Sequence, residues 1–392
     1  MAVDEAAPAA APSPSARALD DSPTLEDESG PLAAGSVDDN EHFDDFLAYL
    51  ARVDAAGVAR RPLDPTGRIV IKVADEADRP LAGVTVSVSA PDGAPIATVI
   101  TTAGGRALFH PSAYGDPLAE YSVSAGGDAV TAKPGASVAV DGQAPKHQPA
   151  ALDIAFVIDA TGSMGDEIGQ LTASVDSVVQ RIEALPSTPD LRLSLTVYRD
   201  KGDAYVSATH DFTGSLAEFR EALALVEADG GGDTPEALDE ALGDALTKPN
   251  WRPAGAAAQL VFLIADASGH ADRRVPQPYT ESMRVAAERG VKVFPISSSE
   301  ADDAAEVTFR QLAQFTGSRF VFLSYGAGGA ATGENTDIDS LDYEELSLDD
   351  LVVRLVDEEL AGRRLLNPTD VPATTTTAPS PTTSSTSIPP GQ

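Results

Sequence analysis

The chain has 392 residues, which is enough for two ordinary domains with additional tails. Its 61 Asp and Glu residues outnumber 27 Lys and Arg residues, so the formal net charge is −34. A surface this acidic repels phosphate backbones and anionic headgroups, which makes nucleic acid and bare membrane poor candidate partners. The sequence contains no cysteine, and this excludes disulfides, thiolate catalysis and Cys-ligated zinc.

The two ends of the chain are expected to be disordered. Residues 1–40 are rich in Ala, Pro, Ser and acids, and residues 367–392 form a Thr/Ser/Pro-rich tail. The first residues lack the basic and apolar regions of an export signal, and no apolar run is long enough to span a bilayer. The tail is of the sort that carries O-glycans on exported proteins. The missing signal favours the cytoplasm, whereas the tail and the β-rich domain described next favour an extracytoplasmic location, so the location stays open with a lean toward the outside.

Residues 41–65 predict a short amphipathic helix followed by a linker, and we expect the helix to pack against the domain that follows it. Over residues 66–145 the apolar period changes to two, and Gly-containing turns separate short strands. This pattern predicts a small β-sandwich. Residues 79–86 and 102–109 resemble transthyretin-like or carboxypeptidase-regulatory-like sandwich repeats. No constellation able to do chemistry lies there, so a spacer or interaction role is expected.

Residues 150–325 alternate apolar strands with helical patterns, which is typical of a parallel sheet flanked by helices. The expected strands are 152–158, 191–198, 260–265, 291–296 and 319–323, with a short antiparallel edge at 205–210. The expected helices are 166–185, 216–227, 235–247, 280–289 and 303–315, and one more lies within 343–366. The predicted fold class is therefore α/β: a Rossmann-like, mostly parallel sheet, with a second, smaller all-β sandwich domain and disordered termini.

Three separated segments place oxygen atoms at strand ends or helix starts. The apolar strand 152–158 stops at Asp159, and the hydroxyls of Thr161 and Ser163 follow at alternate positions. Thr234 follows a glycine run, and Asp266 ends the apolar run 260–265. Open α/β sheets bind ligands at the carboxyl ends of their strands, and hard divalent cations prefer oxygen ligands.

Each of these segments also has a simpler explanation. Ser163 with Asp166 fits a capping box. Thr234-Pro235-Glu236 fits an N-cap, a proline at the first helical position and an acid in the first turn. Asp266 could open a surface loop, and His270 is expected to be an exposed loop residue rather than a ligand.

Taken together, the pattern Asp-x-Thr-x-Ser, a later Thr and a later Asp resembles the metal-ion-dependent adhesion site (MIDAS) of von Willebrand factor type A domains. The resemblance covers roughly residues 150–325. It departs from the family at Thr161, where Ser is more usual, but the hydroxyl is kept. The resemblance implies that Thr161, Ser163 and Thr234 ligate Mg²⁺ (or Mn²⁺ or Ca²⁺) directly or through water. It also implies that Asp159 and Asp266 mostly hold coordinating waters.

An ion held mainly by neutral hydroxyls keeps positive charge and one open position, which an acidic side chain of a protein partner can fill. The resemblance therefore implies a cation-dependent protein-binding module. We place Asp200 and Asp233 at the rim of the site or in contact with its ligands. The sequence does not indicate the oligomeric state.

Two other functions stay open: an adaptor for an AAA-type ATPase, and an architectural surface protein whose metal is purely structural. Enzymatic activity is not expected. The second Asp of aspartate-nucleophile phosphohydrolases is replaced by Thr161, and the glycine pattern of serine hydrolases is incomplete around Ser163. Neither a Gly-x-Gly-x-x-Gly fingerprint nor a P-loop occurs in the sequence.

Overall fold

The structure is a computed structural model that describes residues 33–102, 104–143, 151–232, 234–271, 274–298, 301–324, 346–362 and 365. All of them belong to one compact unit, Leu32–Gln392. Most of residues 1–40 and all of residues 367–392, which we expected to be disordered, lie outside the described residues. None of the described helices is both long enough and apolar enough to cross a membrane.

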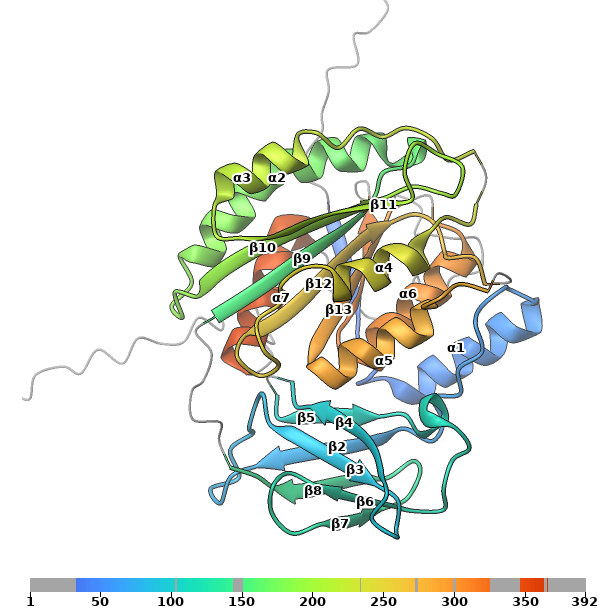
Figure 1. Ribbon diagram of the computed structural model, residues 1–392, viewed down its shortest axis with the longest axis vertical. Coiled ribbons are helices and arrows are strands. Elements are labelled where there is room, and N and C mark those ends of the chain that lie inside the picture. Colours follow the sequence, from blue (N-terminus) through green and yellow to red (C-terminus); the bar gives the residue numbers. More distant parts are fainter. Residues whose placement is uncertain are drawn as a thin grey trace, which may run out of the picture. The chain divides into compact units, whose positions relative to one another are not determined.

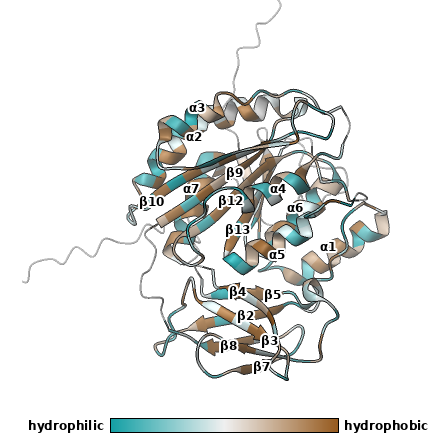
Figure 2. Cartoon of the chain, in the orientation of Figure 1, coloured by the Kyte–Doolittle hydropathy of each residue, from teal (hydrophilic) through white to brown (hydrophobic). Residues whose placement is uncertain are grey.

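An eight-stranded sheet forms the centre of the larger domain (Figure 1). Its strands, in spatial order, are β11 (Ser207–Thr213), β10 (Asp190–Tyr198), β9 (Ala151–Asp159), β12 (Ala258–Ala265), β13 (Val291–Ser297), β14 (Phe320–Ser324), β1 (Ala33–Val37) and β15 (Leu346–Ser347). The five strands from β10 to β14 are parallel, whereas β11 and β1 are antiparallel to their neighbours. Central strands buried on both faces need continuous apolar runs, and Figure 2 shows these strands as mostly hydrophobic.

Helices cover both faces of this sheet. One face packs against α2 (Gly165–Glu183), α3 (Leu216–Leu223) and α7 (Leu348–Ala361). The other packs against α4 (Leu238–Thr247), α5 (Tyr279–Arg289) and α6 (Asp303–Thr316). The predicted α/β fold with a mostly parallel sheet is therefore confirmed, and each expected strand and helix lies within a few residues of its observed position.

The N-terminal part of the chain differs from the prediction. Ala33–Val37, which we expected to be disordered, form strand β1 between β14 and β15. The following helix α1 (Phe43–Ala56) does not pack mainly on the sandwich that comes next in the sequence. Its buried side chains Phe46, Leu50 and Val53 instead cluster with Val307 of α6. The β-sandwich is therefore inserted between two parts of the chain that belong to the larger domain.

The smaller domain is a sandwich of two sheets, as predicted. One sheet contains β5 (Arg106–Phe109), β2 (Ile69–Ala74) and β8 (Ser137–Asp141), and the other β4 (Pro95–Ile100), β3 (Thr85–Ser89), β6 (Tyr121–Ser124) and β7 (Val130–Ala132). Strands β2 and β8 are parallel, and the other pairs are antiparallel. Alternate apolar side chains of both sheets form one buried cluster, which includes Val86, Phe109 and Val123. This alternation is what the period of two in the sequence predicts.

The sandwich contacts the larger domain through its β4–β5 side. The ring of His110, after β5, is fully buried and stacks on Phe315 of α6 with 4.2 Å between ring centroids. The His110 Nε2 atom lies 3.2 Å from Nε2 of Gln314. Burial lowers the pKa of His110 to about 3, with a smaller contribution from the nearby charge of Arg68. His110 is therefore neutral in the folded protein at ordinary pH.

Candidate metal-binding site

Strand β9 lies in the middle of the parallel sheet and delivers Asp159 to its carboxyl edge. The Asp159 side chain is fully buried. Its Oδ1 atom accepts hydrogen bonds from the Thr161 backbone N–H at 3.0 Å and from the Thr161 hydroxyl at 2.7 Å. The Oδ2 atom is buried and has no hydrogen-bond partner among the described residues. The buried Tyr198 hydroxyl also interacts with this carboxylate, and it has no other hydrogen-bond partner among the described residues.

The two hydroxyls of the Asp-x-Thr-x-Ser segment lie beside Asp159. The Thr161 and Ser163 hydroxyl oxygens are 3.4 Å apart, with Thr161 buried and Ser163 exposed. Ser163 does not cap the following helix, because α2 begins at Gly165 with Met164 at its N-cap position and no side-chain cap. The capping-box explanation of Ser163 is therefore wrong, and its hydroxyl faces solvent at the edge of the sheet.

Asp266 follows the neighbouring strand β12 directly. Its side chain is only 8% exposed, and its Oδ1 atom is buried without a hydrogen-bond partner among the described residues. Asp266 is thus not an ordinary surface-loop residue. The pKa of Asp159 is raised to about 7, mainly by burial and to a smaller extent by the negative charge of Asp266, although the hydrogen bonds from Thr161 lower it. The structure brings Asp159, Thr161, Ser163 and Asp266 to one edge of the sheet.

A glycine-rich loop covers this edge and is fixed to the end of β9. The Asp229 and Gly162 backbone N–H groups donate to the carbonyls of Ala160 and Gly230 at 3.1 and 3.2 Å. The loop passes close to Thr161 because Gly231 has no side chain. A Cβ atom added there would lie 3.1 Å from both Thr161 Cβ and Glu236 Oε1, at a φ of +71° that disfavours other residues.

Thr234 lies in the segment between the glycine-rich loop and α4, and its place among the ligands stays a prediction. Thr234 is exposed, and no described contact links its hydroxyl to Asp159, Thr161 or Ser163. The N-cap explanation of Thr234 is wrong, because α4 begins only at Leu238 and Ala237 occupies its N-cap position. Asp233, placed at the rim by the sequence, lies outside the described residues.

Glu236 is the residue that the sequence analysis missed. It was interpreted as an acid in the first turn of a helix, but it precedes α4 and is 3% exposed. Its Oε2 atom is buried without a hydrogen-bond partner among the described residues. Burial raises the pKa of Glu236 to about 8, and the charges of Asp159 and Asp266 are among the causes. The available signal was the acid two residues after Thr234, in a segment that approaches the site.

Asp200, which the sequence places at the rim, contacts His270 in the loop that follows Asp266. Asp200 Oδ1 lies 2.7 Å from Nε2 of His270, whose ring is 5% exposed, so the expectation of an exposed His270 is wrong. The His270 carbonyl accepts a hydrogen bond at 2.8 Å from Arg61, in the linker after α1. Arg61 also pairs with the buried carboxylate of Asp239 at 2.9 Å. These contacts fix the loop that follows Asp266.

The chemistry of these donors fits a hard cation. The site offers two hydroxyls and buried carboxylate oxygens that have no partner, and it has no described Lys or Arg paired with Asp159 or Asp266. Within the described residues, no three Asp, Glu or His side chains converge closely enough to hold a metal ion by themselves. A cation here would therefore depend on the Thr161 and Ser163 hydroxyls and on water, as Mg²⁺ commonly does.

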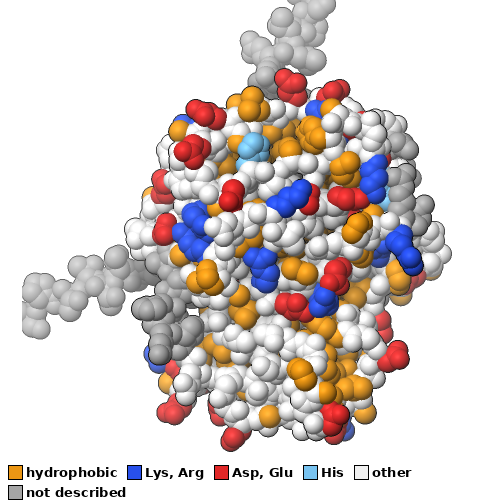
Figure 3. All heavy atoms as spheres, in the orientation of Figure 1, with side chains coloured by type: hydrophobic (Ala, Val, Ile, Leu, Met, Phe, Trp, Pro, Cys, Tyr) orange, Lys and Arg blue, Asp and Glu red, His pale blue; other side chains and the backbone are white. Residues whose placement is uncertain are grey.

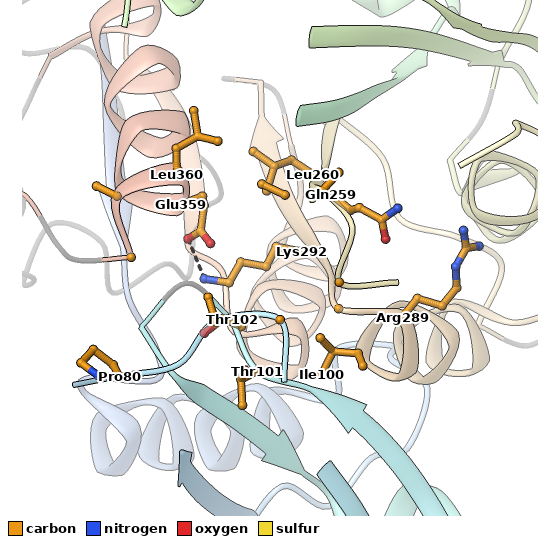
Figure 4. Close-up of a pocket in the computed structure, with 18 residues that line it drawn as sticks. Pro80, Ile100, Thr101, Thr102, Gln259, Leu260, Arg289, Lys292, Glu359 and Leu360 are labelled. Carbon is orange, nitrogen blue, oxygen red and sulfur yellow. Dashed lines mark hydrogen bonds and ion pairs between the residues drawn. The ribbon is translucent and has the colours of Figure 1, made fainter. Parts of the chain in front are cut away.

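A cavity of about 160 Å³ lies at the opposite end of the sheet, where β12 and β13 begin beside the sandwich. Three charged side chains line it: Lys292 and Glu359 pair with each other at 2.6 Å (Figure 4), and Arg289 donates to the carbonyl of Leu246. The space-filling view shows acidic side chains spread over the visible face with basic ones between them (Figure 3).

Comparison with known proteins agrees with this geometry. Residues 153–332 match the family model of the von Willebrand factor A domain. The chain contains a von Willebrand factor A domain. Domains of this family typically serve as interaction modules without catalytic activity, and they commonly bind a divalent metal at a MIDAS.

The curated relatives share only part of this chain. A putative ariadne-like RING finger protein of Acanthamoeba polyphaga mimivirus is 34% identical over 88 residues, which is 22% of this chain and 9% of that protein. The alpha-protein kinase vwkA of Dictyostelium discoideum is 29% identical over 120 residues, 30% of this chain and 19% of the kinase. The chain thus spans less than a fifth of the length of either relative.

Solved structures show the same kind of partial likeness. The pilus adhesin SpaC of Lactobacillus rhamnosus GG matches with a TM-score of 0.35 and 12% identity, over 62% of this chain and 32% of the adhesin. Proximal thread matrix protein 1 of the mussel byssus matches with a TM-score of 0.31 and 16% identity, over 43% of this chain and 41% of that protein. With TM-scores below 0.5, these likenesses carry no functional argument.

Proposed function

We propose that the A domain is a divalent-cation-dependent protein-binding module, with Mg²⁺ (or Mn²⁺ or Ca²⁺) at the edge of the sheet. The observation that carries the proposal is the pair of buried, unpartnered carboxylate oxygens on Asp159 and Asp266, next to the hydroxyls of Thr161 and Ser163. Leaving buried carboxylates without partners is costly unless a cation compensates them. The proposed ion supplies that charge.

The hydroxyls and the carboxylates of the site would have different roles in binding the ion. The Thr161 and Ser163 hydroxyls would ligate the ion, and Asp159 and Asp266 would orient its waters by accepting their hydrogen bonds. Ser163, being exposed, would lie on the side open to a partner. The bound ion supplies a positive charge that attracts an acidic side chain of the partner protein.

The test is capture of protein partners by the immobilised chain in MgCl₂ and in EDTA. Partners that depend on the site should be retained in MgCl₂ and released in EDTA, and Asp159→Ala should lose them while remaining folded. Asp92→Ala, in an exposed turn of the sandwich, is the control and should retain them. Retention that is equal in MgCl₂ and EDTA would contradict the proposal.

Two alternative functions make different predictions in the same experiment. An adaptor for an AAA-type ATPase would retain an ATPase, identified by mass spectrometry of the eluate. A purely architectural role would retain no partner, although Mg²⁺ would still raise the melting temperature. The acidic-partner proposal is favoured here because the exposed Ser163 hydroxyl leaves the site open on one side.

A further inference from the structure

Three basic side chains lie together on the outer face of the β-sandwich. Lys72 of β2 is the register partner of Arg106 of β5, and both are exposed. Arg68 comes directly before β2, four residues from Lys72. Because alternate residues of a strand point to opposite faces, Arg68 and Lys72 lie on the face opposite the buried side chains of β2. We call Arg68, Lys72 and Arg106 the basic strip.

The strip is not paired with acidic side chains. Among the described residues, no ion pair or hydrogen bond involves the side chain of Lys72 or Arg106. Arg68 is held by a neutral partner and by a ring, since it donates to Oδ1 of Asn40 at 2.5 Å and lies 3.6 Å from the centre of the Phe43 ring. The strip therefore presents positive charge on a chain whose net charge is −34.

Placing these cations together is unfavourable for the fold. Like charges directly opposite each other on neighbouring strands destabilise a sheet. The pKa of Arg68 is lowered to about 10, mainly by burial, with a smaller lowering by Arg106 and an opposing effect of Asp38. The chain has 61 acidic residues, yet the residue opposite Lys72 on β8 is Ala139. Protection of an edge strand could explain Arg106 on β5 but not Lys72, because β2 is the central strand of its sheet.

The strip lines two adjoining hollows in the surface. Arg68 and Arg106 line a hollow of about 360 Å³, and Lys72 and Arg106 line a second hollow of about 250 Å³. The acids that line the first are Asp38, Glu41, Glu358 and Glu359, of which the last two pair with Arg319 and Lys292; Asp78 lines the second. The wall that β2 and β5 contribute to both hollows is therefore basic.

The spacing of the strip restricts what can occupy it. Four residues of extended chain separate the Cα atoms of Arg68 and Lys72 by roughly 13 Å, so one small anion such as phosphate does not contact both ends. A net charge of −34 repels long polyanions such as nucleic acid and anionic membrane. A short extended peptide with several carboxylates matches the spacing, and guanidinium groups bind carboxylates through paired hydrogen bonds.

We propose that the basic strip binds a short acidic segment of a partner protein, at a site on the sandwich that is separate from the metal edge. The site gives the sandwich a binding role of its own. It requires no divalent ion, because the charge that attracts the carboxylates comes from Arg68, Lys72 and Arg106. It therefore stands or fails independently of the proposed metal site.

The test is a fluorescence anisotropy titration of a dye-labelled oligoglutamate peptide with the full chain in EDTA at low ionic strength. The peptide should bind the wild type, and added NaCl should weaken binding. The double variant Lys72→Gln with Arg106→Gln should bind about tenfold more weakly, as expected when two exposed charged contacts are lost. Its melting temperature should equal or exceed that of the wild type, because the opposed cations have been removed.

A matched control removes the same charge outside the strip. Lys133→Gln with Arg220→Gln changes two exposed cations elsewhere and should leave the affinity nearly unchanged. Inorganic phosphate should displace the peptide no better than NaCl of equal ionic strength. The proposal is overturned if the wild type does not bind the peptide, if the two double variants bind it equally, or if phosphate displaces it specifically. A lower melting temperature of the strip variant with unchanged binding would show that these cations serve the fold instead.

Discussion

Two regions of the larger domain bury carboxylates, and only one of them pairs these carboxylates with a basic side chain. Between α1 and α6, Arg310 is 1% exposed and binds Asp39 at 2.6 Å and Glu306 at 3.3 Å. At the carboxyl edge of the sheet, Asp159 and Asp266 are buried with unpartnered oxygens and no described Lys or Arg beside them. One region contains its own cation and the other does not.

The comparison shows that this chain compensates buried acids where they serve packing. The Arg310 guanidinium also lies 3.8 Å above the centre of the Tyr49 ring, so its burial is supported by an aromatic contact as well as by two carboxylates. Asp159 and Asp266 are not compensated in this way, because Arg199 in that region donates to backbone carbonyls and Lys201 pairs with Glu240. The simplest physical account is that their cation comes from solution.

The largest effect should come from breaking the compensated region. Arg310→Ala would leave Asp39 and Glu306 buried without their cation, and removing one partner of a buried pair typically costs about 3–5 kcal/mol. We expect a loss of that size in the free energy of unfolding, measured by urea denaturation at pH 7.

The control for Arg310 is an ion pair on the surface. Arg79 is 78% exposed and pairs with Asp75, and exposed pairs contribute about 0–1 kcal/mol. Arg79→Ala should therefore change the free energy of unfolding by less than about 1 kcal/mol. Equal effects of the two substitutions would show that burial does not distinguish these charges.

A smaller effect should come from pH at the contact with the sandwich. The pKa of His110 is lowered from 6.5 to about 3 by burial, so the unfolded chain binds a proton that the folded chain excludes. Stability is therefore complete above about pH 6.5 and is lost as the pH falls from 6.5 toward 3. At pH 5 the loss due to His110 is about 2 kcal/mol.

His110→Asn separates this effect from the titration of other groups, because Asn does not titrate. The fall in unfolding free energy between pH 7 and pH 5 should be about 2 kcal/mol smaller in the variant than in the wild type. Parallel pH profiles for the two proteins would contradict the assignment to His110.

The sequence predicted the sheet and much of its edge because these features depend on local pattern. Continuous apolar runs marked the central strands, and the hydroxyl spacing after Asp159 placed Thr161 and Ser163 beside it. Asp266 followed from the same argument, because parallel neighbouring strands end at one edge. Each of these features could therefore be predicted from a short stretch of sequence.

The remaining features depend on contacts between distant segments. Strand β1, Ala-Ala-Gly-Ser-Val, lacks the alternating pattern of a half-buried strand and is ordered by pairing with β14 and β15. The packing of α1 on α6 is likewise set by three-dimensional contacts. Glu236 was misassigned because the helix was expected to begin at Pro235, whereas α4 begins at Leu238. Because the helix begins three residues later than expected, Glu236 precedes it and is buried instead of lying in its first turn.

The central claim is that the uncompensated carboxylates at the sheet edge hold one divalent ion. Calorimetric titration of the metal-free chain with MgCl₂ tests this most directly. The account predicts one ion per chain for the wild type and none for Asp159→Ala. The absence of Mg²⁺ binding by the wild type, or binding of equal affinity and stoichiometry by Asp159→Ala, would contradict it.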